Sequence, residues 1–156
     1  MMRIEPAQPS DAVEIAAIYA HHVVHGTASY EAEPPSAQEM AARLERCRRE
    51  GWPWLVARDD HATILGYAYV TQFRDRAAYR FVCENSIYIR HDRRGEGIGK
   101  ALLTALLPAA EAFGFRQMIA VIGGAEPASA ALHGRAGFIE TGRMRSVGRK
   151  HGRWLD

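Results

Sequence analysis

Three glycines stand at alternate positions, Gly95, Gly97 and Gly99, directly after two arginines and directly before an apolar helical pattern. Glycine lets main-chain N–H groups approach a ligand closely, because it has no Cβ. The first N–H groups of a helix also point at a bound anion, and they carry the positive end of the helix dipole. The spacing therefore predicts a phosphate site formed by Arg94, the glycines and the start of the helix.

The spacing of these glycines excludes two common phosphate-binding loops. A Walker A loop has four residues between its first glycine and a Gly-Lys pair, followed by Ser or Thr. Here three residues separate Gly95 from Gly99, and Ala101 follows Lys100. A dinucleotide fingerprint reads G-x-G-x-x-G and needs an acidic residue about 20 residues later, and this sequence offers neither. The pattern that fits is Arg-x-x-Gly-x-Gly, from Arg94 to Gly99.

Glu84 interrupts an otherwise apolar or neutral run, FVCENSIYI. Burying a carboxylate is unfavourable unless it is paired or solvated, and burial that raises its pKa makes it a better base near neutral pH. We therefore expect Glu84 to take a proton from an amine, directly or through water. The alternative is an edge-strand glutamate paired with an arginine. The neighbouring Cys83 has no histidine close in sequence, which argues against a covalent cysteine mechanism.

Two further groups of side chains could bind or protonate a substrate. Arg74, Arg76 and Arg80 lie with Tyr79 in a segment before Glu84. Guanidinium groups bind carboxylates and related oxyanions in a bidentate manner, so this segment suits a substrate with an anionic tail. A solvated charged loop would have the same composition. His133 could donate a proton near neutral pH, or it could be a structural or surface residue of a helix.

The composition is that of one ordinary globular domain. The chain has 156 residues, 47% of them hydrophobic and 24% charged, with a formal net charge of +2. That charge is too small for a general nucleic-acid binder. We find no bilayer-spanning run and no signal peptide, so we expect no membrane partner. Cys47 and Cys83 form no C-x-x-C pattern, and we expect a reducing, cytoplasmic environment.

Hydrophobic periodicity predicts the elements that position these residues. Ser10 or Asp11 should cap the first helix, Ser36 and Glu39 should form a capping box for the second, and Gly114 and Gly137 should end the last two. The expected strands are 3–6, 54–58, 64–73, 80–90, 118–122 (buried on both faces) and 138–149 (a last strand or hairpin arm), and the expected helices are about 11–24, 37–50, 97–113 and 128–136.

This order predicts an α+β domain with one mixed central sheet, and it resembles the GNAT fold of acyl-CoA N-acyltransferases. Three segments, NSIYIRHDRRGEGIGKALL, ALHGRAGF and VGRKHGRWLD, are similar to the phosphinothricin and methionine-sulfoximine N-acetyltransferase branch of that family. The resemblance spans 3–156 and implies a single GNAT domain over 1–156. In that branch a further apolar strand follows the Trp-Leu-Asp, so either this chain is truncated after Asp156 or it lacks the last strand.

The resemblance implies acetyl-CoA as co-substrate and a small-molecule amine, an amino acid or analogue, acetylated by direct transfer in a ternary complex. It implies that Glu84 is the base and that His133 stands where relatives have a tyrosine that protonates the leaving thiolate. The relatives are commonly homodimers, so the resemblance also implies a homodimer here. Trp52 and Trp154, expected to be exposed, could form part of its interface. The implied cofactor contacts are Ile87, Tyr88, Ile89, Arg94, Gly95, Glu96, Gly97, Ile98, Gly99, Lys100 and Glu126. The implied substrate contacts are Tyr30, Arg74, Asp75, Arg76, Tyr79, Arg80, Asn85 and Ser86.

Two alternatives to this activity stay open. The enzyme could acetylate a protein N-terminus or another peptide amine. The chain could also be an acyl-CoA-binding module without catalysis, because Glu126 replaces an asparagine whose amide contacts the cofactor in the relatives. Asn85 replaces a histidine, which argues against a proton relay through that position. Arg74-Asp75-Arg76 replaces an Arg-Pro-Phe segment, so substrate choice is expected to differ.

Overall fold

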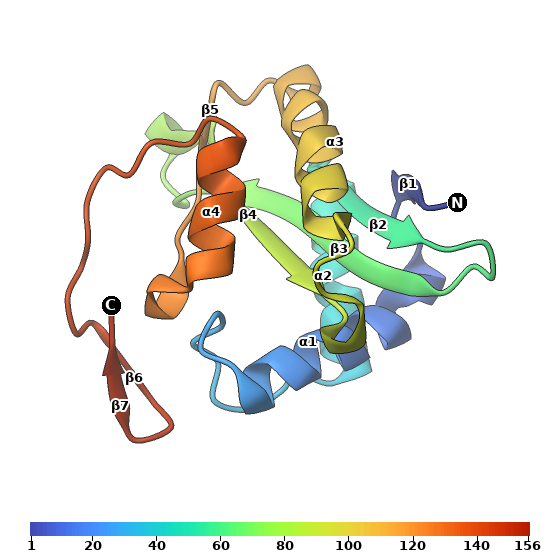
Figure 1. Cartoon of the computed structure of the whole chain (residues 1–156). Helices are drawn as coiled ribbons and strands as arrows, with labels where there is room; N and C mark the ends of the chain where they lie inside the picture. The colour runs from blue at the N-terminus through green and yellow to red at the C-terminus, as the bar shows by residue number, and fades with distance from the viewer.

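The computed structural model describes residues 1–156 and is built around a five-stranded sheet in the order β1-β2-β3-β4-β5 (Figure 1). All neighbouring strands are antiparallel except β4 and β5, which are parallel. This is the predicted α+β class with one mixed sheet. The strands are β1 (Arg3–Pro6), β2 (Trp54–Arg58), β3 (Ile64–Gln72), β4 (Val82–Ile89) and β5 (Gln117–Ile119).

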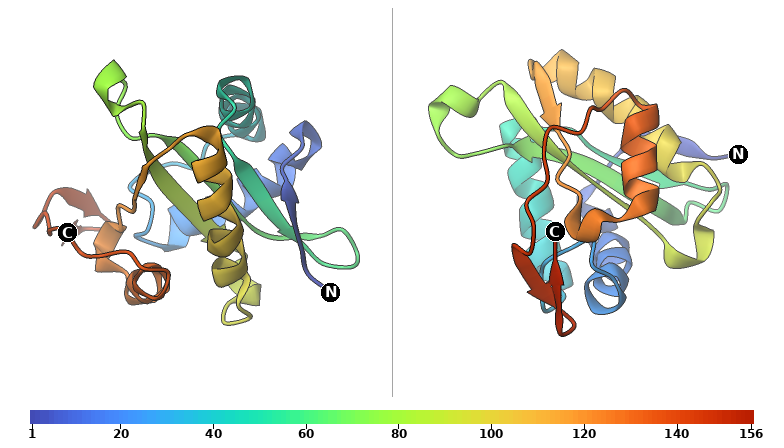
Figure 2. Two further views of the ribbon diagram at one scale, coloured as in Figure 1. Left: turned by 90° about the horizontal axis from the view of Figure 1, so that it is seen from above. Right: turned by 60° about the vertical axis from the view of Figure 1, so that its left-hand side comes forward.

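Helices cover both faces of this sheet (Figures 1 and 2). On one face lie α1 (Ala12–His25) and α2 (Ala37–Glu50), and on the other lie α3 (Ile98–Phe113) and α4 (Pro127–Arg135). Each long helix buries one apolar stripe. In α2 the stripe is Met40, Leu44 and Cys47, at the spacing of one helical face, and in α3 Leu102 and Leu106 are fully buried against the sheet. None of the helices is both long and apolar enough to cross a bilayer.

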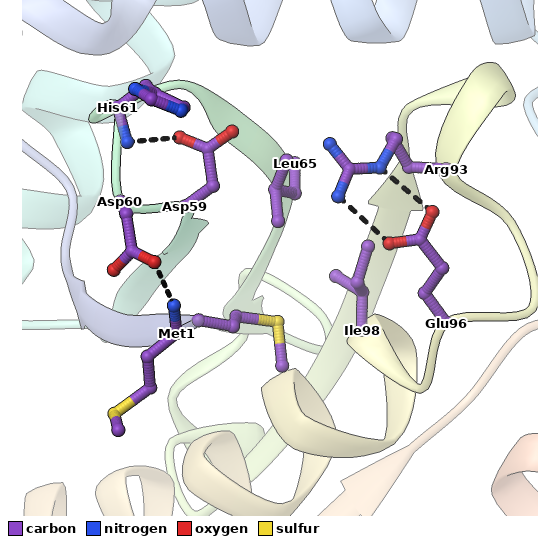
Figure 3. A pocket seen from close by; sticks show the side chains of 9 residues that line it. Met1, Asp59, Asp60, His61, Leu65, Arg93, Glu96 and Ile98 are labelled. Atoms are coloured by element: carbon purple, nitrogen blue, oxygen red, sulfur yellow. Dashed lines mark hydrogen bonds and ion pairs between the residues drawn. The ribbon is translucent and has the colours of Figure 1, made fainter.

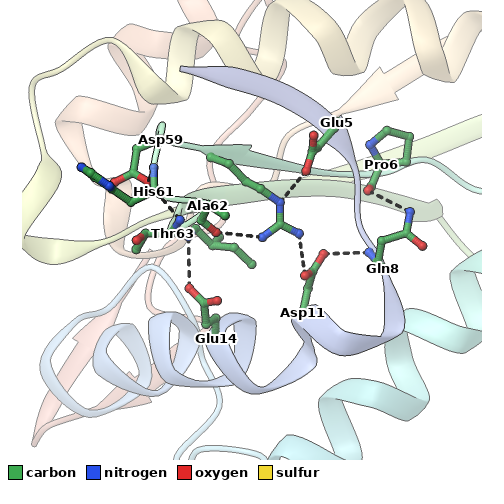
Figure 4. A network of polar contacts seen from close by, with 11 residues as sticks. Glu5, Pro6, Gln8, Asp11, Glu14, Asp59, His61, Ala62 and Thr63 are labelled. Atoms are coloured by element: carbon green, nitrogen blue, oxygen red, sulfur yellow. Dashed lines mark hydrogen bonds and ion pairs between the residues drawn. The ribbon is translucent and has the colours of Figure 1, made fainter. Parts of the chain in front are cut away.

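The helix ends follow the predicted signals with two exceptions. The Ser36 hydroxyl accepts a hydrogen bond from the Glu39 N–H at 3.0 Å, and Gly51 ends α2 with a φ of 77°. The Glu39 carboxylate, however, accepts from Arg43 at 3.2 Å and does not complete the capping box at Ser36. Asp11 likewise makes no side-chain cap to α1. Its carboxylate instead accepts from the Gln8 N–H and pairs with the largely buried guanidinium of Arg58, whose side chain is 12% exposed (Figure 4). Asp11 therefore fastens the β1–α1 junction to β2.

The predicted strand 80–90 begins two residues late, at Val82, because Ala77–Tyr79 forms a 3-10 turn just before it. The strand predicted at 118–122 is the three-residue β5, whose residues are exposed or half-buried. Burial on both faces was therefore a wrong prediction. The reason is that β5 pairs only with β4 and forms the edge of the main sheet.

The last strand or hairpin arm predicted at 138–149 is confirmed only at its end, where Gly148 and Arg149 belong to β6. Phe138 to Ser146 forms no strand, and Ile139 is 85% exposed. A strand needs hydrogen-bond partners for its backbone N–H and C=O groups. No strand of the main sheet pairs with 138–146. β6 (Gly148–Lys150) and β7 (Arg153–Leu155) form a separate two-stranded sheet, apart from the main sheet (Figure 1). Trp154 on β7 is exposed as expected, whereas Trp52 is buried, contrary to expectation.

The β6–β7 hairpin is tied to the loop that joins α1 and α2. The buried Lys150 ammonium donates to the Ser29 carbonyl at 2.7 Å. The Tyr30 hydroxyl donates to the Asp156 carbonyl and accepts from the Gly124 N–H. Tyr30, predicted to line a substrate cavity, thus connects the α1–α2 loop to Gly124 and to Asp156 at the end of the chain.

Candidate active site

β4 presents different groups to its two faces and to its edge. Side chains alternate along a strand, so Glu84 and Ser86 share the face of Tyr88, which contacts Tyr19 of α1 with ring centroids 4.9 Å apart. Asn85 projects to the opposite face, where its side chain contacts His133 of α4. An amine and an acyl donor could therefore approach this one strand from different sides.

Glu84 is half-buried and forms no ion pair, so the alternative of an edge glutamate paired with arginine is not what the structure has. Burial raises the pKa of Glu84 above its ordinary value, and the positive charge of Arg74 partly opposes this rise. A carboxyl with a raised pKa and a free oxygen can accept a proton from an ammonium group. The neighbouring Cys83 is fully buried, and burial raises the pKa of its thiol to about 12, which leaves almost no thiolate.

The edge of β4 beyond Glu84 has no neighbouring strand. β5 pairs with β4 only from Val82 to Glu84. The Arg90 N–H donates to Leu65 of β3 at 2.9 Å, so in the alternating antiparallel pattern Tyr88 also directs its backbone to β3, whereas Ile87 and Ile89 direct theirs to the open edge.

Of the three residues predicted to bind pantetheine through their backbones, Ile87 has the free edge groups. His22 already contacts the Ile89 carbonyl at 2.6 Å. The Tyr88 backbone faces β3, and its ring packs among Tyr19, Tyr67 and His22. The exposed edge is therefore shorter than the prediction had it.

The glycine loop forms an open cradle at the start of α3. Gly95 and Gly97 have φ of 79° and 78°, and a Cβ at either position would meet nothing within 4 Å. Gly97 is the residue before α3, so the first N–H groups of the helix point out of its end. Arg94 and Lys100 are exposed and form no ion pair. The donor set and the open space fit a pyrophosphate.

Three other predicted members of the loop contact the protein itself and support the loop. Ile98 is 2% exposed and belongs to the core. The Glu96 carboxylate pairs with Arg93 at 2.8 and 2.9 Å, where both line a hollow of about 490 Å³ beside Met1, Asp60 and Leu65 (Figure 3). A Cβ on Gly99 would lie 3.2 Å from Leu132 of α4, so this glycine lets α3 and α4 approach each other.

Glu126 caps α4. Its carboxylate accepts a hydrogen bond from the Ser129 N–H at 2.7 Å, and Pro127 occupies the first helical position. A negative charge at a helix N-terminus is favourable. The side chain that replaces the relatives' asparagine is thus already engaged by its own helix.

His133 is buried between α4 and β4. Its Nδ1 lies 2.8 Å from the Ser129 carbonyl and its Nε2 lies 2.9 Å from the Asn85 amide. A carbonyl can only accept, so Nδ1 carries the proton and Nε2 accepts from the amide N–H. In this arrangement His133 directs its one N–H at its own helix and has none free for a leaving thiolate, so its role as proton donor stays a prediction.

The arginines of the predicted substrate segment are exposed and lie against their own neighbours. The Arg74 guanidinium sits 4.3 Å from the Phe73 ring centroid, and that of Arg80 sits 4.4 Å from the Phe81 centroid. Tyr79 packs edge-on against Phe73. Arg76 makes no ion pair, and Asp75 approaches only Arg46, at 3.9 Å. Arg74 is the member whose charge reaches Glu84.

The comparisons with known proteins agree with this arrangement. Residues 4–156 match the family model described as an acetyltransferase (GNAT) domain. The chain belongs to the GNAT acetyltransferase family. It is 46% identical to phosphinothricin N-acetyltransferase of Alcaligenes faecalis, over 98% of this chain and 78% of that one. It is 40% identical to the L-methionine sulfoximine/L-methionine sulfone acetyltransferase of Pseudomonas aeruginosa, over 98% of this chain and 89% of that one.

A solved structure extends the likeness to three dimensions. The phosphinothricin acetyltransferase of Sinorhizobium meliloti, in complex with acetyl-CoA, superimposes with a TM-score of 0.96 at 49% identity, covering 99% of this chain and 83% of that one. Acetyl-CoA is accordingly the co-substrate expected for this GNAT acetyltransferase, and the open loop at Gly95 and Gly97 suits its pyrophosphate.

Two features of this GNAT acetyltransferase escaped the sequence reasoning. One is the Asn85–His133 hydrogen bond, which joins residues 48 apart that no local pattern connects. The other is a row of arginines on α2, Arg43, Arg46 and Arg49, which lie three apart and so share a helix face over the sheet. That spacing was readable from the sequence, but their position over the sheet was not.

Proposed function

We propose that this GNAT acetyltransferase transfers the acetyl group of acetyl-CoA to the amine of a small amino acid or analogue, of the phosphinothricin or methionine-sulfoximine type. The observation that carries the proposal is that β4 presents a candidate base on one face and unpaired backbone groups at its edge. The half-buried Glu84 lies on one face, and the unpaired edge at Ile87 leads to the glycine loop at the end of the same strand. The named activities of the Alcaligenes and Pseudomonas relatives support the substrate class.

In the proposed mechanism, Glu84 takes the proton of the substrate ammonium group, so that the neutral amine can attack the thioester carbonyl. The Ile87 N–H, at the unpaired edge, stabilises the charge that develops on the carbonyl oxygen. Arg94, Lys100 and the loop N–H groups hold the pyrophosphate. The tetrahedral intermediate then collapses: its C–S bond breaks, and its nitrogen loses a second proton to solvent. Because both ring nitrogens of His133 are engaged, the leaving thiolate takes its proton from solvent or from the protonated Glu84.

A panel of amines tests this proposal. Thiol release from acetyl-CoA is measured with phosphinothricin, methionine sulfone, neutral amino acids and a peptide with a free N-terminus. We expect rapid release with the first two compounds. Faster release with the peptide would favour a peptide N-acetyltransferase. Binding of CoA without release for any amine would favour a non-catalytic module.

We further propose that the enzyme works in the cytoplasm as a homodimer. Both cysteines are free and buried, as in proteins of reducing compartments. Trp154 is 65% exposed on β7, and Val147 and Met144 near it are exposed as well, which gives the C-terminal region the apolar surface of an interface. Light scattering at high micromolar concentration should give the mass of two chains, and the mass of one chain would contradict the dimer.

A further inference from the structure

A second hollow lies on the α1/α2 side of the sheet, between α2 and strands β2 and β3. Its volume is about 440 Å³. Arg43, Arg46 and Arg49 of α2 line one side of it, and Trp54, Tyr69 and Thr71 of the sheet line the other.

The sheet wall of this hollow continues directly to Glu84. In the β3–β4 pairing Thr71 stands opposite Glu84, and Tyr69 stands opposite Ser86. Residues opposite each other in an antiparallel pair project to the same face, with Cβ atoms about 4.5–5.5 Å apart. One strand spacing therefore separates the hollow from the proposed base.

Two of the three arginines are free to bind an anion. Arg43 is committed, because its guanidinium pairs with Glu31 at 2.7 and 3.1 Å and with Glu39 at 3.2 Å. Arg49 forms no ion pair. The contact of Arg46 with Asp75 is long, 3.9 Å, and the Asp75 side chain is 99% exposed to water. Glu39, the one acidic residue of the hollow, is already neutralised by Arg43.

The aromatic wall offers a complementary surface for a short aliphatic chain. The rings of Trp54 and Tyr69 are stacked, with centroids 3.9 Å apart. The buried Nε1–H of Trp54 has no hydrogen-bond partner, and a buried donor without an acceptor is rare in proteins. Cationic, aromatic and donor groups thus meet within reach of Glu84.

We propose that this hollow is the anion subsite of the enzyme, in which Arg46 and Arg49 bind the acidic group of the amine substrate while its amine lies at Glu84. The inference rests on the proposed function and specifies how the substrate is recognised. Two guanidinium groups on one helix face suit carboxylate, phosphinate or sulfonyl oxygens, which accept bidentate hydrogen bonds. The site would select amino acids whose tail carries phosphinate, carboxylate or sulfonyl oxygens over amines whose tail has no such oxygens.

Direct binding tests the subsite without relying on catalysis. L-Phosphinothricin is titrated by calorimetry into the protein in the absence of acetyl-CoA. Arg46→Ala and Arg49→Ala should each raise the dissociation constant about tenfold or more, because each removes a charge-assisted contact. Arg48→Ala is the matched control, because Arg48 lies on the same helix, pairs with Glu45 and does not line the hollow. Asp75→Ala removes the Arg46–Asp75 contact but keeps the Arg46 guanidinium. If the loss of affinity in Arg46→Ala comes only from that contact, Asp75→Ala should weaken phosphinothricin binding equally. If Arg46 binds phosphinothricin directly, Asp75→Ala should not weaken binding.

Steady-state kinetics supply a second measurement. Both arginine variants should raise KM for phosphinothricin while leaving KM for acetyl-CoA and for an apolar amino acid amide unchanged. Wild-type phosphinothricin affinity in the Arg46→Ala,Arg49→Ala double variant would overturn the subsite, and so would no detectable binding to the wild type at millimolar concentration. If the wild type acetylates no amine but binds phosphinothricin in an Arg46- and Arg49-dependent way, the proposed function fails and the subsite stands. If phosphinothricin is acetylated with the same KM in all variants, the subsite fails and the function stands.

Discussion

Glu84 and Asn85 are neighbours in sequence, but their side chains face opposite sides of the sheet and have different surroundings. Glu84 is half-buried, without an ion partner, and its pKa is raised by burial. Asn85 is buried and hydrogen-bonded to His133. We therefore expect substitutions at the two positions to differ in what they change.

Glu84→Gln keeps the shape of the side chain but removes the basic oxygen. We expect kcat to fall by about 10²–10⁴ with little change in KM, because the proton is moved in the transition state. The residual activity should rise with pH, since more of the substrate amine is then already deprotonated. Wild-type kcat at neutral pH would mean that another group, or none, removes the proton.

His133 provides the contrasting case. In His133→Gln the amide oxygen can still accept the hydrogen bond from Asn85, so kcat should stay within about threefold of wild type and the pH–rate profile should be unchanged. His133→Leu leaves the buried Asn85 amide without its acceptor and should lower stability by about 1–3 kcal/mol. A fall in kcat of about 10² or more in His133→Gln, with a changed pH profile, would instead restore His133 as the proton donor.

The glycine loop shows how one motif combines binding and packing. Gly97 needs a left-handed backbone, whereas Gly99 needs space beside Leu132. We expect Gly97→Val to strain the loop and Gly99→Val to push α4 from α3, and both should raise the dissociation constant for CoA tenfold or more. Gly134→Ala in α4 is the control, because its Cβ meets nothing within 4 Å and alanine favours a helix. Unchanged CoA affinity in a folded Gly99→Val variant would contradict the assignment of the loop.

The long elements were predictable because their patterns are local. The apolar stripe of α3, the Ser36 cap and the strands β2 and β3 all depend on residues a few positions apart. The segment 138–146 has the composition of a strand but forms none, because a strand also requires a partner strand and the segment's own sequence does not specify one. Glu84 and the glycine loop could be located for the same local reason. The places of His133, Tyr30 and Arg46 could not, because each depends on a contact with a distant segment.

The ionisation of Glu84 should make the folding stability of the whole molecule depend on pH. Burial raises the pKa of Glu84 in the folded protein above its ordinary value, so the folded state binds the proton more tightly. This contribution stabilises the fold at low pH and is lost as pH rises through the raised pKa. Glu84→Gln should therefore raise Tm at pH 8, and the difference should disappear as pH falls below the pKa that an exposed glutamate has. Equal melting curves at every pH, measured by calorimetry, would show that burial of this carboxylate has no effect on folding.

The arrangement of groups around β4 also has a consequence for how such enzymes diversify. The groups proposed for the amine, Glu84, Arg46 and Arg49, lie on the α1/α2 side, whereas the glycine loop and the packing of α3 against α4 lie at the other end and on the other side of the sheet. Substitutions on α2 can then change which amine is accepted without disturbing the acyl donor. A library confined to the positions of α2 that line the hollow should yield new amine preferences while every member keeps the parent's requirement for acetyl-CoA.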